Sequence, residues 1–421
     1  MILDSTQEKG RLEFIARAVL LMLAFDIWWN VLAQAGRYGF RDFNVAHFAW
    51  LDLLQPMPSP GLYIGVLLLA SVLAVFGALF WRTTTSTTAI AGLWTWAWAS
   101  SLMDSYQHHY YLSLVLVALI GFPKKNGESQ WGFGALCAST AIMYFWAAFA
   151  KALPDWQGGA ALRIVARGRR DEVESLFSWL GLGNDFGWQL ASIGVVLVQV
   201  LIGAAYLGAW LRGRRPTPSR LLDILCVAGM LGGLSFHIGA EWLGLKIGWF
   251  SYYMVVLSVL VLAPNGMWQF LWEKLPKWKN LPFNAPVSLL LVMLGALAIV
   301  WVDLPGALGV AILIGLGGVV LMIRNLERAM SYAVGIFMAG GLMLLSFEAS
   351  DTRWDFYRFS GGDASRVAAL VKDPTDKIKY LDAAIFAYQK ANQYAPPGES
   401  REKQLQRVIT IRAQKNADLE N

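Results

Sequence analysis

Residues 286–324, PVSLLLVMLGALAIVWVDLPGALGVAILIGLGGVVLMIR, contain two long apolar runs separated by residues 303–305. A run of about 20 apolar residues is long enough to cross the hydrocarbon core of a bilayer. Backbone N–H and C=O groups in lipid need internal partners, so such runs are expected to be helices. This stretch therefore predicts two membrane spans, at residues 286–302 and 306–323.

The same pattern recurs along a chain that is 56% hydrophobic and only 15% charged, where soluble domains carry about 25% charged residues. Further spans are predicted at residues 12–33, 60–81, 88–104, 106–122, 131–153, 186–211, 221–242, 248–263 and 329–347. We therefore predict an all-α fold, a polytopic transmembrane helix bundle of about 9–11 spans with a short soluble helical C-terminal tail. The basic residues behind the net charge of +6 cluster between apolar runs, which indicates topology signals rather than nucleic-acid binding.

The basic residues also predict an orientation. Alternate connections contain Arg82, then Lys124 and Lys125, then Arg212, Arg214, Arg215 and Arg220, then Lys274, Lys277 and Lys279, and finally Arg324 and Arg328. Positively charged loops face the cytoplasm, so we expect a multi-pass protein of the cell (inner) membrane with its N-terminus in the cytoplasm. An odd number of spans then places the C-terminus on the periplasmic or extracellular side. A second arginine group, from Arg163 to Arg170, falls on the predicted outer side, against this rule.

With this orientation, three polar clusters lie at the outer ends of their helices: DSYQHH (104–109), KALPDW (151–156) and FHIGAEW (236–242). Convergence of titratable groups from distant parts of a chain is a requirement of an active site. Cys137 and Cys226 each lie alone in an apolar run, so no thiolate metal site or disulfide framework is expected, and we predict no metal site.

Lys151 admits two interpretations. It can be a lysine whose stem lies along the bilayer edge while its ammonium group reaches water. Alternatively, burial among Trp146, Phe149 and Trp156 lowers its pKa, and a neutral lysine can serve as a general base. Pro154 is expected to end the helix just beyond it.

The histidines are equally open to two interpretations. His108 and His109, beside Tyr110, fit either an interfacial polar and aromatic belt or a site. Adjacent helical residues point about 100° apart, so at most one of the two histidines would face a shared cavity. His237 precedes Glu241 by one turn, so the carboxylate could hold the imidazole tautomer, or the pair could satisfy each other within the bundle.

Three segments together resemble a known family. YQHHYYLSLVLVALIGF (106–122), YFWAAFAKALPDWQGG (144–159) and FHIGAEWLGLKIGWFSYYMVVLSVLVLAP (236–264) resemble the membrane domain of vitamin K-dependent gamma-glutamyl carboxylase, whose bacterial relatives are the horizontally transferred transmembrane (HTTM) proteins. The resemblance covers roughly residues 12–270. Its most specific part is the stretch from Lys151 to Trp156.

The resemblance implies a chemistry. The carboxylases use reduced vitamin K, O2 and CO2, and a lysine matching Lys151 deprotonates the hydroquinone. A histidine in the segment of His108 or His109 assists, and His108 is the better match. We expect His237 to support the site, and Trp146, Phe149, Trp156 and Tyr110 to form aromatic walls for a reduced quinone. The carboxylases carry a large lumenal β-rich domain, whereas this chain continues with further apolar runs.

Three segments are thus expected: a carboxylase-like HTTM domain at 1–270, additional transmembrane helices at 271–348, and a soluble tail at 349–421. The tail, with YLDAAIFAYQKANQYAPPGESREKQLQRVITIRAQ, predicts two amphipathic helices around a Pro-Pro-Gly break and resembles one tetratricopeptide unit. The leading hypothesis is a quinol- and O2-dependent enzyme, a carboxylase or oxygenase-type lyase, that modifies a peptide or small protein held at the outer face by the C-terminal helices. The alternatives are a non-enzymatic maturation or assembly factor for a secreted peptide and, ranked last, a small-molecule transporter.

Overall fold

The protein is described here from a computed structural model, which describes residues 5–37, 59–80, 84–100, 107–122, 131–214, 217–245, 249–265, 267–268, 281–349 and 352–420. Within these ranges all regular secondary structure is helical, which confirms the predicted all-α class. The predicted cytoplasmic charges Arg82, Lys124, Lys125, Arg215, Lys274, Lys277 and Lys279 lie outside the described residues.

Each predicted span coincides with a helix. These helices are α1 (Ser5–Asp26), α3 (Pro60–Phe80), α4 (Thr84–Ala99), α5 (Gln107–Ile120), α6 (Trp131–Phe149), α10 (Asn184–Arg214), α11 (Arg220–Trp242), α12 (Phe250–Leu262), α14 (Ala285–Trp301), α15 (Ala307–Arg324) and α16 (Ala329–Ala349). Among the described residues, seven helices are long and apolar enough to cross a membrane, and three more apolar helices are shorter. The 21 residues of α3, for example, extend about 31 Å, close to the roughly 30 Å of a hydrocarbon core. The chain is a multi-pass integral membrane protein.

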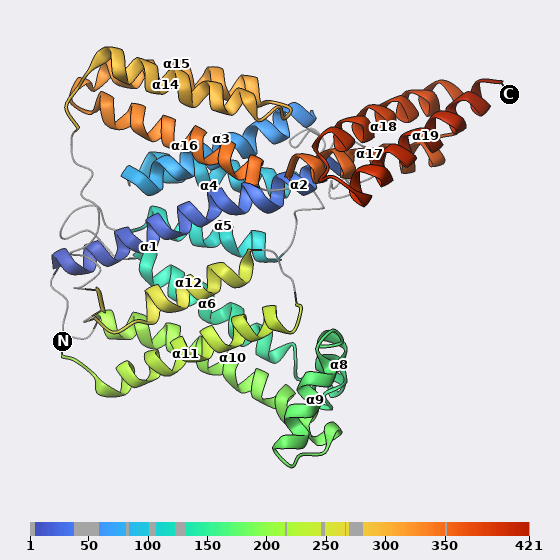
Figure 1. The fold of residues 1–421 in the computed structure, drawn as a ribbon. Helices are drawn as coiled ribbons and strands as arrows, with labels where there is room; N and C mark the ends of the chain where they lie inside the picture. The colour runs from blue at the N-terminus through green and yellow to red at the C-terminus, as the bar shows by residue number, and fades with distance from the viewer. Residues whose placement is uncertain are drawn as a thin grey trace. The chain divides into compact units, whose positions relative to one another are not determined.

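Contacts divide the helices into two groups (Figure 1). The first group contains Met1–Val19 and Leu114–Lys277, and the second contains Leu20–Ser113 and Trp278–Asn421. Because this grouping interleaves the chain, the three segments expected from the sequence stay a prediction.

In the first group, α6 packs against α10, α10 against α11, and α11 against α12. Two arginines hold the C-terminal end of α12: Arg11 of α1 donates to the backbone oxygen of Val261, and Arg212 of α10 donates to that of Ala263 at 3.1 Å. The last carbonyls of a helix carry partial negative charge, so both guanidinium groups stabilise this helix end.

A compact segment of short helices joins α6 to α10. It contains α7 (Pro154–Gln157), α8 (Ala160–Val165) and α9 (Arg170–Trp179), and we name residues 154–182 the cap. The cap has its own apolar core, in which Leu162, Ala166 and Phe177 pack on Trp188 of α10. Gly159, at φ 86°, lies so close to Trp188 that a Cβ would be 2.7 Å from its backbone carbonyl carbon. These helices were not predicted from the sequence.

In the second group, α14, α15 and α16 lie side by side (Figure 1). Glycines allow the closest approach: a Cβ on Gly340 of α16 would lie 2.9 Å from the Cα of Gly295 in α14. Small residues at helix interfaces let backbones pack closely, and this packing is a main source of association in lipid.

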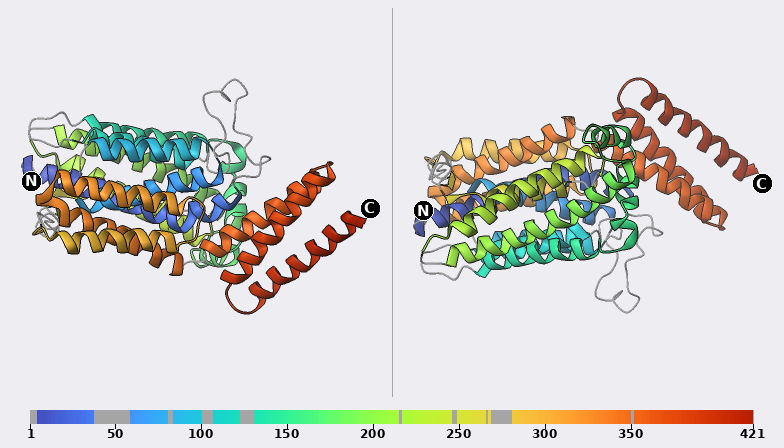
Figure 2. Two further views of the ribbon diagram at one scale, coloured as in Figure 1. Left: turned by 90° about the horizontal axis from the view of Figure 1, so that it is seen from above. Right: turned by 90° about the horizontal axis from the view of Figure 1, so that it is seen from below.

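The C-terminal tail belongs to the second group and has three helices: α17 (Thr352–Leu370), α18 (Pro374–Tyr394) and α19 (Glu399–Glu420). The two predicted amphipathic helices and their break are confirmed, with Gly398 at φ 95°, and Figure 2 shows α18 and α19 running antiparallel. Helix α17 was not predicted from the sequence. It supplies Ala364 and Ala368 to a core shared with Leu381 and Tyr388. An additional helix is what a single tetratricopeptide-like pair needs to bury its apolar face.

Asp303 lies in the turn of the helical hairpin formed by α14 and α15, and it joins the C-terminal tail to this hairpin. Its carboxylate accepts hydrogen bonds from Tyr394 at 2.9 Å and Lys390 at 3.2 Å, and its backbone oxygen accepts one from Tyr357 at 3.1 Å. Burial acts to raise the pKa of Asp303, but the bonds from Tyr394 and Lys390 outweigh it, and the net pKa is lowered. Asp303 also adopts φ 52°, in the left-handed region that residues other than glycine rarely adopt and that Asp and Asn tolerate best among them.

Replacing Asp303 by Ala is expected to loosen the tail. The change removes both side-chain hydrogen bonds and leaves a β-carbon at a positive φ, at a cost of about 1 kcal/mol for a half-exposed carboxylate. Faster hydrogen exchange in α17 and α18 is the expected measurement. Asp303→Asn, which keeps an acceptor and tolerates the same φ, should exchange much more slowly than the alanine variant. Equal exchange in all three proteins would contradict this role.

Candidate functional site

An apolar cavity of about 480 Å³ lies inside the first group. Its walls come from the end of α6, the cap, α10, α11 and the start of α12. The apolar lining residues include Leu162, Val165, Val195, Phe236, Leu243 and Phe250. Three of the residues predicted for the site, Lys151, Trp156 and His237, line this cavity.

Lys151 lies just beyond the last full turn of α6. Its backbone N–H still bonds to the oxygen of Ala148 at 3.1 Å, and Pro154 starts the next helix. The Nζ atom donates to the backbone oxygen of Ala147 at 3.0 Å and lies 5.2 Å from the ring centroid of Trp156. No carboxylate among the described residues pairs with it. Burial without a counter-charge lowers the pKa of Lys151.

His237 is only 1% exposed, and its Nε2 shares a 2.6 Å hydrogen bond with the hydroxyl of Tyr144. Its Nδ1 has no hydrogen-bond partner among the described residues. The expected partner, Glu241, does not bond to it, and the Glu241 Oε1 is itself buried without a partner in the part of the chain described. The i, i+4 spacing permits that pair, but Tyr144 on α6 provides a closer partner for the ring.

Two polar residues were missed, one that lines this cavity and one that contacts His237. Gln199 of α10 lines it, and its Oε1 is buried with no hydrogen-bond partner in the described structure. Tyr144, buried and stacked on Tyr206 at 6.3 Å, orients His237. Gln199 could have been found as the one polar residue in the apolar run VVLVQVLIG, and Tyr144 by its spacing of two turns from Lys151.

The other predicted aromatic walls lie elsewhere. Trp146 and Phe149 are each 69% exposed, and they pack on each other with ring centroids 5.6 Å apart. Neither lines the cavity. An exposed aromatic pair near the end of a span fits the interfacial belt of a membrane protein.

His108 and Tyr110 belong to the second group. His108 is half-buried, with its ring centroid 4.3 Å from that of His109, and Tyr110 is 55% exposed beside Trp98. His109 is the buried member of the histidine pair, edge-on to Trp94 at 5.2 Å. Of the predicted site residues, Lys151, His237 and Trp156 therefore line one cavity. His108 and Tyr110 belong to the second group of helices and do not line the described cavity. Asp104 of the same cluster lies outside the described residues.

The cavity has the properties of a small-molecule site. Its volume falls within the roughly 300–1,000 Å³ of such sites, which are mostly apolar with a few placed polar groups. Lys151, His237 and Gln199 are polar residues of its lining, and they provide an amine, an imidazole and an amide. Among the described residues, no three His, Cys, Asp or Glu side chains form a group that could hold a metal ion.

Comparison of the chain with protein-family models, with curated proteins and with solved structures gave no match.

Proposed function

We propose that this membrane protein is a quinol- and O2-dependent enzyme of the carboxylase-like HTTM type, which modifies a peptide at the outer membrane face. The observation that supports the proposal is the shared cavity of Lys151, His237 and Trp156. An apolar space with polar groups fits an aromatic ring that carries hydroxyl groups. A reduced quinone bound there would supply reducing equivalents to O2, and CO2 would supply the added carbon, as the family resemblance implies.

Lys151 acts as the base in this proposal. Its lowered pKa increases the neutral fraction, which can remove a proton from a ligand hydroxyl. The resulting ammonium group is stabilised by the Ala147 carbonyl and the face of Trp156. His237 and Gln199 orient the ligand as polar members of the lining, and Tyr144 holds the imidazole through its hydrogen bond to Nε2.

The remaining parts of the proposal follow from the sequence. The N-terminus is cytoplasmic, the C-terminus is on the outer side of the inner membrane, and Lys151 lies at the outer end of its helix, as the positive-inside rule implies. The supporting role that the resemblance implies for His108, and the quinone contact expected of Tyr110, stay predictions, because the described residues that line the cavity include neither of them. The polar tail binds the peptide or small protein that is modified.

Filling the cavity tests the proposal directly. In Ala240→Phe, a phenyl ring on a lining residue is expected to weaken binding of a short-chain menaquinone by at least about tenfold, because the ligand and the ring compete for the same space. Ile238→Phe is the matched control, since Ile238 is exposed on the same helix and lines no part of the cavity. Binding to the purified protein in detergent is measured by isothermal titration calorimetry. No binding to the wild type, or equal affinity in both variants, would overturn the proposed site.

A second candidate is an assembly or maturation factor without catalysis. It is favoured by the bond from Lys151 to Ala147, because a cation at the end of α6 satisfies a terminal carbonyl and stabilises the helix. In that case, removal of Lys151 would lower stability in detergent, and no quinone would bind.

A further inference from the structure

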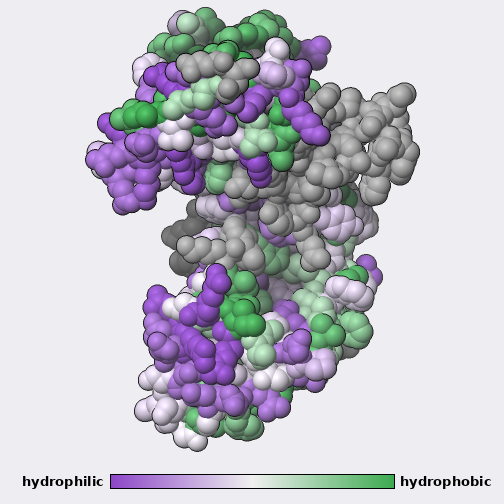
Figure 3. All heavy atoms as spheres, turned by 90° about the vertical axis from the view of Figure 1, so that its right-hand side faces the viewer, coloured by the Kyte–Doolittle hydropathy of each residue, from purple (hydrophilic) through white to green (hydrophobic). Residues whose placement is uncertain are grey.

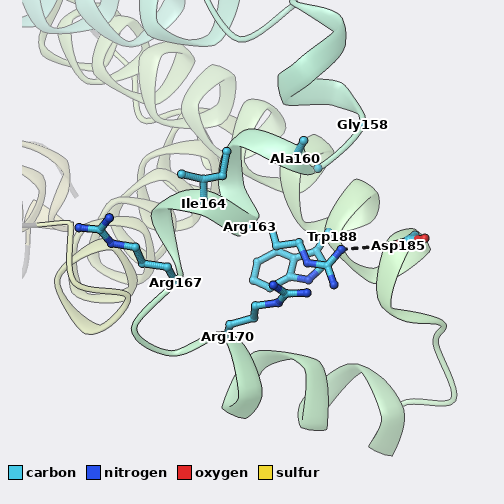
Figure 4. A pocket seen from close by; sticks show the side chains of 9 residues that line it. Gly158, Ala160, Arg163, Ile164, Arg167, Arg170, Asp185 and Trp188 are labelled. Carbon is cyan, nitrogen blue, oxygen red and sulfur yellow. Dashed lines mark hydrogen bonds and ion pairs between the residues drawn. The ribbon is translucent and has the colours of Figure 1, made fainter.

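A second cavity, of about 520 Å³, lies on the cap and is rich in arginine (Figure 4). Arg163, Arg167 and Arg170 line it together with Trp188, and Asp185 is the one carboxylate among the described residues of its wall. Figure 4 shows Arg163 and Arg170 beside the indole of Trp188, whereas Arg167 lies at the other edge of the cavity and its guanidinium group points away from them. The quinone proposal uses none of these residues.

Glu174 fixes two of the arginines. Its Oε1 accepts a bond from Arg170 Nε at 2.9 Å and from Trp188 Nε1 at 3.0 Å, and it lies 2.9 Å from Arg163 Nη2. The bond from Arg170, followed by that from Trp188, lowers the pKa of Glu174 to about 2, so the carboxylate stays ionised. One carboxylate therefore holds two guanidinium groups in place, and each of them has further N–H donors.

The arginines outnumber their acidic neighbours. Glu174 and Asp185 are the carboxylates that contact Arg163 and Arg170, and Asp185 is nearly fully exposed, 3.4 Å from Arg163. Arg167 has no ion pair in the described part of the chain, and Arg163 Nε is buried without a partner there. Three cations against two carboxylates leave an excess of one positive charge, which suits an anionic ligand.

The cap is also built for a membrane surface. It connects the ends of two spans, α6 and α10, and it exposes large apolar side chains, with Ile164 70% and Trp179 80% exposed. In Figure 3 the cap forms the lower surface, where hydrophobic side chains lie among hydrophilic ones. Tryptophan and arginine side by side are typical of the headgroup region of a bilayer.

We propose that the arginine cavity of the cap binds the headgroup phosphate of an anionic phospholipid. Guanidinium groups match phosphate oxygens in geometry and charge, and the bilayer beside the cap supplies this ligand at high local concentration. Phosphate binding would explain why arginines occur on the predicted outer side, where the positive-inside rule does not expect them. This site is independent of the quinone cavity.

The test is lipid binding by the full-length protein in detergent. Dioctanoyl phosphatidylglycerol is titrated and bound lipid is counted by native mass spectrometry, with dioctanoyl phosphatidylcholine as the neutral comparison. Arg167→Gln is expected to weaken phosphatidylglycerol binding about fivefold, the factor that corresponds to about 1 kcal/mol for one basic residue near an anionic surface. Arg167 makes no ion pair among the described residues, so the variant should unfold at the wild-type temperature.

Arg169→Gln is the matched control. Arg169 lies in the same segment and carries the same charge, but it pairs with Glu172 and does not line the cavity. Equal loss of binding in both variants would show diffuse attraction and overturn the site, as would equal affinity of the wild type for the two lipids. Inorganic phosphate and a soluble oligoglutamate peptide are added as competitors. Displacement of the lipid by either at micromolar concentration would replace the lipid proposal with a free-anion or an acidic-peptide site.

Discussion

Lys151→Ala is expected to lower the rate of quinol-dependent peptide modification by about 10²–10⁴-fold, the usual contribution of a general base. The reason is that Lys151 is the one lysine among the described residues that line the cavity. The other polar side chains there include an imidazole, an amide and the hydroxyl of Ser235. The rate is measured by incorporation of labelled CO2 into a peptide in membranes that contain reduced quinone. Lys372→Ala, which changes an exposed lysine of the tail, should have wild-type activity.

Lys151→Arg distinguishes the role of Lys151 as a general base from a structural role at the end of α6. Arginine keeps a donor for the Ala147 carbonyl and a cation for Trp156, but it stays protonated at any workable pH. A stable but inactive Lys151→Arg protein is the expected result. If the arginine variant retained activity while the alanine variant unfolded, Lys151 would be a structural residue and the second candidate function would hold.

The same residue predicts a pH dependence. Activity needs the neutral amine, so the rate should rise with pH and level off above the pKa of Lys151. Burial lowers this pKa, so the plateau should begin below the value of about 10.4 that is usual for lysine. Below the pKa, the rate should fall about tenfold per pH unit as the amine is protonated. A pH–rate profile without this limb would exclude Lys151 as the base.

Gly340→Val is expected to destabilise the second group of helices by about 1–3 kcal/mol or more, as overpacking does in closely packed interiors. A Cβ at this position meets the backbone of Gly295, 2.9 Å from its Cα, and neither backbone can move without separating α14 from α16. The measurement is the free energy of unfolding in mixed micelles with increasing dodecyl sulfate.

The adjacent glycine provides the control. A Cβ on Gly341 meets no atom of the described residues within 4 Å, so Gly341→Val carries the same change of helix propensity without the clash. The difference between the two variants therefore reports the approach of α14 and α16 alone. Equal unfolding energies would show that these helices do not pack through Gly340.

The sequence predicted the spans well because the signal is local. Each apolar run must form a helix in lipid, whichever neighbours it has, and every predicted span coincides with a helix. The cap and α17 were missed for the opposite reason. Their helices are short or polar and are stabilised by partners distant in the sequence, such as Trp188 under the cap and Tyr388 beside Gly361.

The candidate site was predictable in part. Helical geometry at about 100° per residue places Tyr144 within roughly 20° of Lys151, and Trp146 and Phe149 on the far side of the helix. Their spacing thus already favours Tyr144, although aromatic content near Lys151 points to the other two. The choice of Tyr144 over Glu241 as the partner of His237 depends on how α6 packs against the helices around it, which one helix pattern does not encode.

The Asp303 turn also sets an order of events during synthesis. Its partners Lys390 and Tyr394 follow it by 87 and 91 residues, so at about 5–20 residues per second they are made roughly 4–18 s later. Until then Asp303 holds its positive φ in the turn between α14 and α15 without the hydrogen bonds from Lys390 and Tyr394. Closure of this turn therefore marks the moment at which the nascent chain has acquired α18.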